Sequence, residues 1–218
     1  VIQLAVALLF WRDGSAGDGL GWSDFPLDDG WIHLVYARSV ATTGLPAYNA
    51  GELAAGMTSP LWVALEALVW WPAQLFTDNP TALPKVLSLA FGIATAVLVY
   101  RRVSALQCGR LAALAAGVLV CLDPDTAFAR AAGMEVTLFT ALMLGAIEAW
   151  EARAWTLLGV LLGLGILARP EGAVVVAVVA LGAVLAVRGS SSSTSAGSSS
   201  AGSSAASSLR AVGRVAAP

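Results

Sequence analysis

The chain has 218 residues, of which 58% are hydrophobic and 12% are charged, and its mean hydropathy is +0.78. A soluble domain of this size exposes far more charge, so the composition predicts a polytopic membrane protein. The net charge of −2 and the lack of a basic cluster exclude a nucleic acid as the partner. Two cysteines, Cys108 and Cys121, are too few for a disulfide scaffold and lack the spacing of metal ligands.

Both ends of the chain are expected to be cut from a longer protein. Residues 1–11 are apolar but would span only roughly 16 Å as a helix, about half a bilayer, which indicates the end of a spanning helix. Residues 189–218 are rich in Ser, Ala and Gly, and such a composition buries too little apolar surface to fold. We therefore expect a membrane domain over 1–188, with a long polar loop over about 12–82, and then a disordered cytoplasmic segment over 189–218.

The polar loop is expected to carry two juxtamembrane helices. The first is predicted over Gly30–Thr43, with Asp29 as its N-cap and a glycine after its C-terminus. The second begins at Ser59 and Pro60, a capping residue followed by proline at the first helical position, and Pro72 is expected to stop it. About 12 residues span roughly 18 Å, which is too short to cross a bilayer.

The helix predicted over Gly30–Thr43 is amphipathic and is expected to lie at the membrane surface. His33 lies off its predicted apolar face. Because it is the only histidine in the chain, histidine-dependent metal or triad chemistry is not expected. The predicted apolar face comprises Ile32, Val35, Tyr36 and Val40.

Apolar segments further along the chain predict the spanning helices. Together with the cut helix at the start they give about six spans, and so an all-α polytopic membrane fold. The segments are approximately Lys85–Tyr100, Leu111–Leu122, Val136–Trp150, Trp155–Ala168 and Ala173–Val187.

Short loops rich in arginine mark the cytoplasmic side of a membrane protein. If the helix over 60–71 stays at the surface, the arginine-rich loops face the cytoplasm and the adjacent Asp28 and Asp29 face outward. Of the 14 acidic residues, all but Glu148 and Glu151 then lie on the outer side. If that helix spans the membrane, the sidedness reverses; we take the first topology as the expectation.

Four polar clusters then gather at the outer ends of the predicted helices. The carboxylates of Asp28 and Asp29 repel each other when ionised, so one can act as a general base or the pair can hold a divalent cation. An arginine in the same place can bind a phosphate through two hydrogen bonds. Each cluster also has an ordinary structural explanation as a helix cap, a turn or an interfacial ion pair. The clusters are Asp28-Asp29, Asp123-Pro124-Asp125, Arg130 to Glu135, and Arg169-Pro170-Glu171-Gly172.

The order of the motifs is more specific than any one of them. The first loop reads Asp28-Asp29-Gly30-Trp31-Ile32, Tyr36-Ala37-Arg38-Ser39, Tyr48-Asn49-Ala50-Gly51-Glu52 and Thr58-Ser59-Pro60-Leu61-Trp62, followed later by Gly133-Met134-Glu135 and Arg169-Pro170-Glu171-Gly172. Over roughly residues 1–188 this order resembles the GT-C glycosyltransferases, in particular the arabinofuranosyltransferases of mycobacterial cell walls and their bacterial relatives. The two later motifs are similar to the Gly-Leu-Glu-Thr segment and the Arg-Pro-Glu-Gly turn of that family.

The resemblance implies a multi-pass transferase of the bacterial inner membrane with its active site on the outer face. Such an enzyme moves a sugar from a polyprenyl-phosphate donor to a hydroxyl of a glycan, lipid or protein, with inversion. It implies that Asp29 or Asp28 is the catalytic base, with Asp29 preferred, and that Mg or Mn would bind this pair if a metal is used. The substrate-binding residues are expected to be Arg169, Glu171, Glu135, Arg130 and Trp62.

Two alternatives stay open at this point. Family members have nine or more spans and often a soluble carboxy-terminal domain, so a chain with about six spans is also compatible with a non-catalytic membrane fragment. The other alternative is a transporter or flippase subunit for lipid-linked sugars. Transporters place their charged groups near mid-membrane in broken helices, whereas here the charges lie at the ends of the apolar segments, which favours an enzyme.

Overall fold

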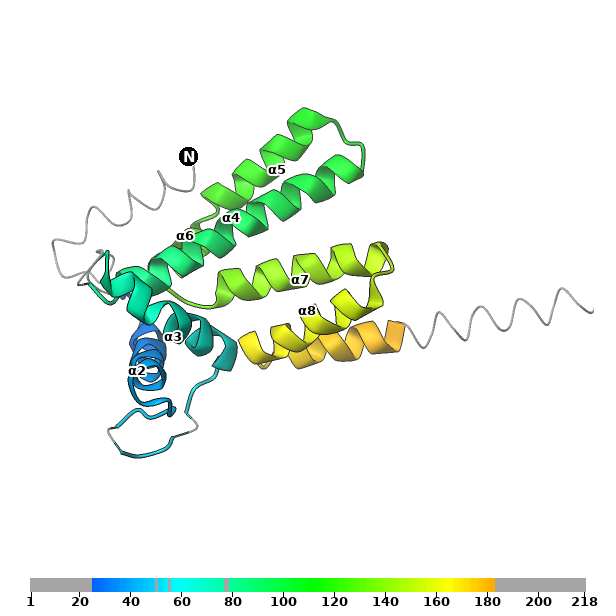
Figure 1. Cartoon of the computed structure of the whole chain (residues 1–218). Helices are drawn as coiled ribbons and strands as arrows, with labels where there is room; N and C mark the ends of the chain where they lie inside the picture. Colours follow the sequence, from blue (N-terminus) through cyan, green and yellow to red (C-terminus); the bar gives the residue numbers. More distant parts are fainter. Residues whose placement is uncertain (1–24, 50, 55, 77–78, 183–218) are drawn as a thin grey trace, which may run out of the picture. The chain divides into compact units, whose positions relative to one another are not determined.

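The computed structural model of the chain describes residues 25–49, 51–54, 56–76 and 79–182, and the regular elements within these ranges are helices (Figure 1). The prediction of an all-α protein is thereby confirmed. The chain divides into two compact units, Val1–Ala173 and Val174–Pro218, and the site described below lies in the first. The spanning helix predicted over 1–11, the domain boundary at 188 and the disordered segment over 189–218 lie outside the described residues.

The apolar segments predicted between residues 85 and 168 all fall within helices, whose ends lie within five residues of the predicted ones. The helices are α2 (Asp28–Thr43), α3 (Pro60–Gln74), α4 (Ala82–Ala105), α5 (Arg110–Leu122), α6 (Pro124–Ala131), α7 (Val136–Glu151) and α8 (Trp155–Ala168). A further short apolar helix covers Gly172–Gly182.

Within the described residues, α4 is the one helix that is by itself long and apolar enough to cross a membrane. Helices α5 and α6 meet the same criterion as a pair, with a bend of 48° between them. Helix α8 is apolar but has 14 residues, which span roughly 21 Å of a hydrocarbon core about 30 Å thick. The helices therefore stand where they were predicted, and the number of six spans stays a prediction.

Four of the helices pack side by side: α4 and α5 are antiparallel, as are α7 and α8, whereas α4 and α7 run in parallel. Helix α4 lies against both α5 and α7, and α7 lies against α8 (Figure 1). Helix α2 packs on α3, which in turn contacts α4 and α8. Large apolar side chains remain exposed along these helices, among them Ile93, Val97, Leu114, Leu119 and Val160. An apolar surface of this extent is typical of contact with lipid or with another protein.

Helix α2 differs from its prediction in two respects. It begins at Asp28 after an extended Leu27, so the prediction of Asp29 as N-cap is wrong; both carboxylates instead lie in the first turn, where the helix dipole favours negative charge. His33 is buried rather than on a polar face, because the start of α2 also packs against the loop between α6 and α7. The predicted C-terminus is confirmed: Gly44 has a φ of 76° and donates its N–H to the carbonyl of Val40.

Helix α3 begins as predicted, with Ser59 at the N-cap position and Pro60 at the first helical position. The Ser59 hydroxyl does not cap the helix; it donates to the carbonyl oxygen of Ala168 at 2.5 Å and so ties the start of α3 to the end of α8. The prediction that Pro72 stops this helix is wrong, since α3 continues to Gln74. A proline this close to the last turn disrupts little, because few helical hydrogen bonds remain beyond it.

Two ion pairs join the ends of α4 and α7. Arg101 Nη2 lies 3.5 Å from Glu148 Oε2, and Arg102 forms an ion pair with Glu151. These are the two acids that the predicted topology placed on the cytoplasmic side, and each has an arginine of that side as its partner. Exposed pairs add little to stability, but they place the two helix ends at the same level.

Candidate functional site

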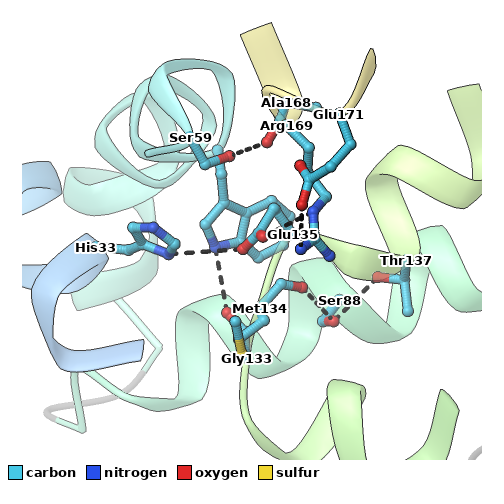
Figure 2. Close-up of polar contacts among 11 residues, drawn as sticks. His33, Ser59, Ser88, Gly133, Met134, Glu135, Thr137, Ala168, Arg169 and Glu171 are labelled. Carbon is cyan, nitrogen blue, oxygen red and sulfur yellow. Dashed lines mark hydrogen bonds and ion pairs between the residues drawn. The ribbon is translucent and has the colours of Figure 1, made fainter. Parts of the chain in front are cut away.

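Two of the predicted motifs meet in one charged cluster, in which Glu135 before α7 and Arg169 after α8 are joined by His33 of α2, a residue to which no role was predicted (Figure 2). His33 Nδ1 lies 3.8 Å from Glu135 Oε2, and Arg169 Nε lies 3.6 Å from Glu135 Oε1. The Glu135 carboxylate therefore stands between an imidazole and a guanidinium that come from distant parts of the sequence.

The charged cluster reaches from the interior to the surface through Arg169. Arg169 Nη2 donates to Glu171 Oε1 at 3.2 Å, so one guanidinium is shared by two carboxylates. The exposed fraction of the side chain rises from 6% for Glu135 to 31% for Arg169 and 63% for Glu171. The pKa of Glu171 is lowered first by a hydrogen bond from the backbone N–H of Glu171 itself and then by the Arg169 guanidinium, and the Glu171 carboxylate therefore stays ionised. The guanidinium is thus held in place while part of it stays accessible.

Two atoms of the charged cluster lack a hydrogen-bond partner among the described residues. His33 Nδ1 and Glu135 Oε2 are both buried, and their separation of 3.8 Å is too long for a hydrogen bond between them. Buried polar atoms without a partner are rare in folded proteins. These two atoms face each other in the interior of the protein.

The predicted Asp pair occupies two different faces of α2. Asp29 precedes His33 by four residues, so the two side chains lie on the same face of the helix. Burial lowers the pKa of His33, whereas the carboxylates of Glu135 and then Asp29 raise it, so Asp29 acts on the imidazole from the exposed end of α2. Asp28 lies on the neighbouring face, in line with Trp31 and Val35. The structure therefore links Asp29, and not Asp28, to the charged cluster.

The lowered pKa of His33 makes the stability of the protein depend on pH. As the pH falls below 6.5, the unfolded chain takes up a proton at this residue more readily than the folded protein, so the free energy of unfolding decreases. We expect thermal unfolding of the detergent-solubilised protein to show a lower Tm at pH 5 than at pH 7. In His33→Asn this difference is expected to shrink, and an unchanged difference would assign the pH dependence to other groups.

Two of the predicted substrate-binding residues do not join the charged cluster. Arg130 is 1% exposed and donates from Nη2 to the carbonyl of Cys121 at 3.1 Å, so it turns toward the end of α5. Trp62 is fully buried and donates from Nε1 to the carbonyl of Gly133 at 3.1 Å. Its indole thus supports the loop that carries Glu135, and it presents no surface to a substrate in this structure.

The Asp123-Pro124-Asp125 cluster has a structural role. Asp123 caps α6, because its carboxylate accepts a hydrogen bond of 2.8 Å from the backbone N–H of Thr126. Pro124 then occupies the first helical position, as is common after a cap. Of the four polar clusters, this one is explained by the fold alone.

Glu66 is a buried acid near the site to which the sequence reasoning assigned no role. It lies in the middle of α3 and is fully buried, and neither carboxylate oxygen has a hydrogen-bond partner among the described residues. Burial raises its pKa well above the ordinary value, although the nearby Trp62 indole lowers it in part, and the Glu135 carboxylate adds to the rise. Burial thus favours the neutral form of the Glu66 carboxyl group. The signal in the sequence was an acidic residue in the middle of an apolar helix.

No group of three or more His, Cys, Asp and Glu side chains in the described ranges is arranged to hold a metal ion. The predicted binding of Mg or Mn by Asp28 and Asp29 stays a prediction. Comparison of the chain with protein-family models, curated proteins and solved structures found no match.

Proposed function

We propose that the protein is a membrane glycosyltransferase that moves a sugar from a polyprenyl-phosphate donor to a hydroxyl acceptor, with inversion. The observation that carries the proposal is the convergence of three distant parts of the chain on one cluster: the first loop through His33, which lies on the same face of α2 as Asp29, the Gly-Met-Glu segment through Glu135, and the Arg-Pro-Glu-Gly turn through Arg169. These are the motifs in which the chain resembles GT-C glycosyltransferases.

The proposed reaction uses Asp29 as general base. The acceptor oxygen attacks the anomeric carbon on the face opposite the lipid phosphate, and its proton passes to the Asp29 carboxylate. The bond between the anomeric carbon and the phosphate oxygen breaks, and the polyprenyl phosphate leaves with the electron pair. Arg169 neutralises the negative charge of that phosphate, while Glu135 and Glu171 fix the direction of its guanidinium.

The proposed setting is the bacterial inner membrane, with about six spans and the charged cluster at the outer face. The exposed apolar side chains of α4, α5 and α8 support contact of these helices with lipid. The two Arg–Glu pairs lie at the C-terminal ends of α4 and α7, away from the charged cluster, and their arginines support a cytoplasmic position for those ends. If Mg or Mn binds the exposed Asp pair, the ion would assist the leaving phosphate. The roles proposed for Arg169, Glu135 and Glu171 do not depend on a metal ion.

The proposal is tested with the full-length protein in proteoliposomes, supplied with prenyl-phosphate arabinofuranose or prenyl-phosphate mannose as donor. Transfer of the sugar to a neutral glycan acceptor supports the enzyme. Movement of the intact donor across the bilayer without transfer would instead support the transporter or flippase alternative. The absence of both from correctly inserted protein would favour a non-catalytic membrane protein.

In the same assay, Arg169→Ala is expected to lower kcat/KM for the donor by about 10- to 100-fold. A hydrogen-bonded charge pair contributes about 1.5–3 kcal/mol, which corresponds to this range. Arg110→Ala serves as the matched control, because Arg110 is an exposed arginine at the start of α5. Equal kcat/KM values for both variants would contradict the phosphate role of Arg169.

A further inference from the structure

A chain of buried hydroxyl groups lies between α4 and α7, directly beside the loop that carries Glu135 (Figure 2). The Ser88 hydroxyl donates to the carbonyl oxygen of Met134 at 3.0 Å, and Ser88 Oγ lies 3.0 Å from Thr137 Oγ1. Because a serine hydroxyl has one hydrogen, the Thr137 hydroxyl is the donor of the second bond. Both side chains are buried. The two bonds therefore run from α7 through α4 to the residue before Glu135.

The Glu135 side chain is not held by its own helix. Glu135 stands at the N-cap position of α7, where a side chain often accepts an N–H of the first helical turn, but it makes no such bond. Its carboxylate instead lies 3.8 Å from His33 Nδ1 and 3.6 Å from Arg169 Nε. The direction of the carboxylate thus depends on the backbone that enters α7.

That backbone is held at two consecutive carbonyl groups. The Trp62 indole of α3 binds the carbonyl of Gly133. Ser88 of α4 binds the carbonyl of the next residue, Met134. The Met134 carbonyl belongs to the planar peptide group that joins Met134 to Glu135. Because a rotation of this group turns the Cα–Cβ bond of Glu135, the Ser88 hydroxyl acts on that side chain through a single peptide group.

The partner of Ser88 is unusual for a hydroxyl in an apolar helix. Helix α4 is by itself long and apolar enough to cross a membrane, and a Ser or Thr in such a helix commonly bonds to a carbonyl one turn earlier. Thr95 of the same helix does so: its hydroxyl donates to the carbonyl of Phe91 at 2.9 Å and lies 3.5 Å from the carbonyl of Thr137. Ser88 instead donates to the loop before α7, which indicates that its hydroxyl serves the loop.

We propose that Ser88 is a positioning residue for Glu135. With Thr137 as its own donor, Ser88 holds the peptide group before Glu135 and so directs the Glu135 carboxylate toward the charged cluster. It acts through the backbone and is not a catalytic residue. Its effect on sugar transfer rests on the proposed function, in which Glu135 fixes the direction of the Arg169 guanidinium.

The positioning role is tested by an NMR titration of His33 with the protein in nanodiscs. His33 is the single histidine of the sequence, so its imidazole signal identifies itself. Burial lowers the pKa of His33, the carboxylates of Glu135 and then Asp29 raise it, and Arg169 lies beyond Glu135. In Ser88→Ala, Glu135 is expected to turn away and the pKa of His33 to fall further, as it should in Glu135→Gln. General loosening would admit water and raise this pKa, so the direction of the shift distinguishes the two causes.

Matched variants separate this role from the loss of any buried hydroxyl. Thr95→Val removes a buried hydroxyl of α4 that has no bond to the loop, and it is expected to leave the titration of His33 unchanged. Thr137→Val keeps the shape of threonine but removes the donor to Ser88, so a smaller fall than in Ser88→Ala is expected. Thr137→Ser keeps the hydroxyl and should titrate as the wild type does.

A His33 pKa that is unchanged or raised in Ser88→Ala would overturn the inference, as would equal shifts in Ser88→Ala and Thr95→Val. If Ser88→Ala does not fold, equal titrations of Thr137→Val and Thr137→Ser would overturn it.

The transfer assay provides a second measurement. Ser88→Ala is expected to lower kcat/KM for the donor by about 3- to 10-fold, the range of one buried hydrogen bond, and Thr95→Val to leave it unchanged. Because the titration uses no substrate, the expected shift of His33 in a protein that transfers no sugar would refute the proposed enzyme and leave the positioning role standing. Transfer by the wild type with an unshifted His33 in Ser88→Ala would do the reverse.

Discussion

Asp29→Asn is expected to reduce sugar transfer by about 10²- to 10⁴-fold, the contribution of a well-placed general base. Asparagine has nearly the size of aspartate but cannot accept the proton of the acceptor hydroxyl at neutral pH. Because Asp29 is exposed in the first turn of α2, the substitution should leave membrane insertion and folding intact. The measurement is the kcat of the full-length protein in proteoliposomes with a prenyl-phosphate sugar as donor.

A control variant is needed to distinguish the loss of a catalytic base from the loss of a negative charge in the first turn of a helix. Asp125→Asn removes another exposed acid from a first helical turn, in α6, and is expected to leave kcat unchanged. Asp28→Asn is expected to have the smaller effect of the two variants of the pair, because only Asp29 lies on the face of His33. Full activity in both single variants would refute the assignment of the base to this pair.

Gly133→Ala is expected to destabilise the protein by about 2–5 kcal/mol, from left-handed backbone strain and overpacking together. Gly133 has a φ of 63°, and a Cβ atom there would lie 2.8 Å from Phe25 Cε1 and 3.0 Å from Pro84 Cβ. The loop cannot move away freely, because Trp62 holds the Gly133 carbonyl. Thermal or denaturant unfolding in detergent measures the loss, and transfer should fall with it because Glu135 follows two residues later.

Gly44→Ala separates the two causes of that loss. Gly44 has a similar φ of 76°, but nothing lies within 4 Å of the position of a Cβ atom. We therefore expect the backbone cost alone, about 1 kcal/mol. If both alanine variants lose the same stability, close packing at Gly133 is not the reason for its glycine.

The helices could be predicted from the sequence because each apolar run has a clear local boundary. Glu135 and Arg169 were found for the same reason, as charged residues at the ends of such runs. The burial of His33 was missed because helical spacing shows on which face of the helix a residue lies but not what packs against that face. Helix α2 is covered both by α3 and by the loop between α6 and α7. The predictions of the α2 cap and of the α3 C-terminus were wrong because both depend on the backbone geometry of a single turn. Residue type biases this geometry but does not determine it.

The first turn of α3 holds both the segment that carries Glu135 and the segment that carries Arg169. Ser59 holds the carbonyl of Ala168, next to Arg169, and Trp62 holds the carbonyl of Gly133, two residues before Glu135. A small shift of this turn would carry both side chains in the same direction, so their mutual spacing would change less than their distance to His33 and Asp29 on α2. Substitutions that reposition α3 would then change the distances of Arg169 and Glu135 from His33 and Asp29 without breaking the ion pair that orients the guanidinium.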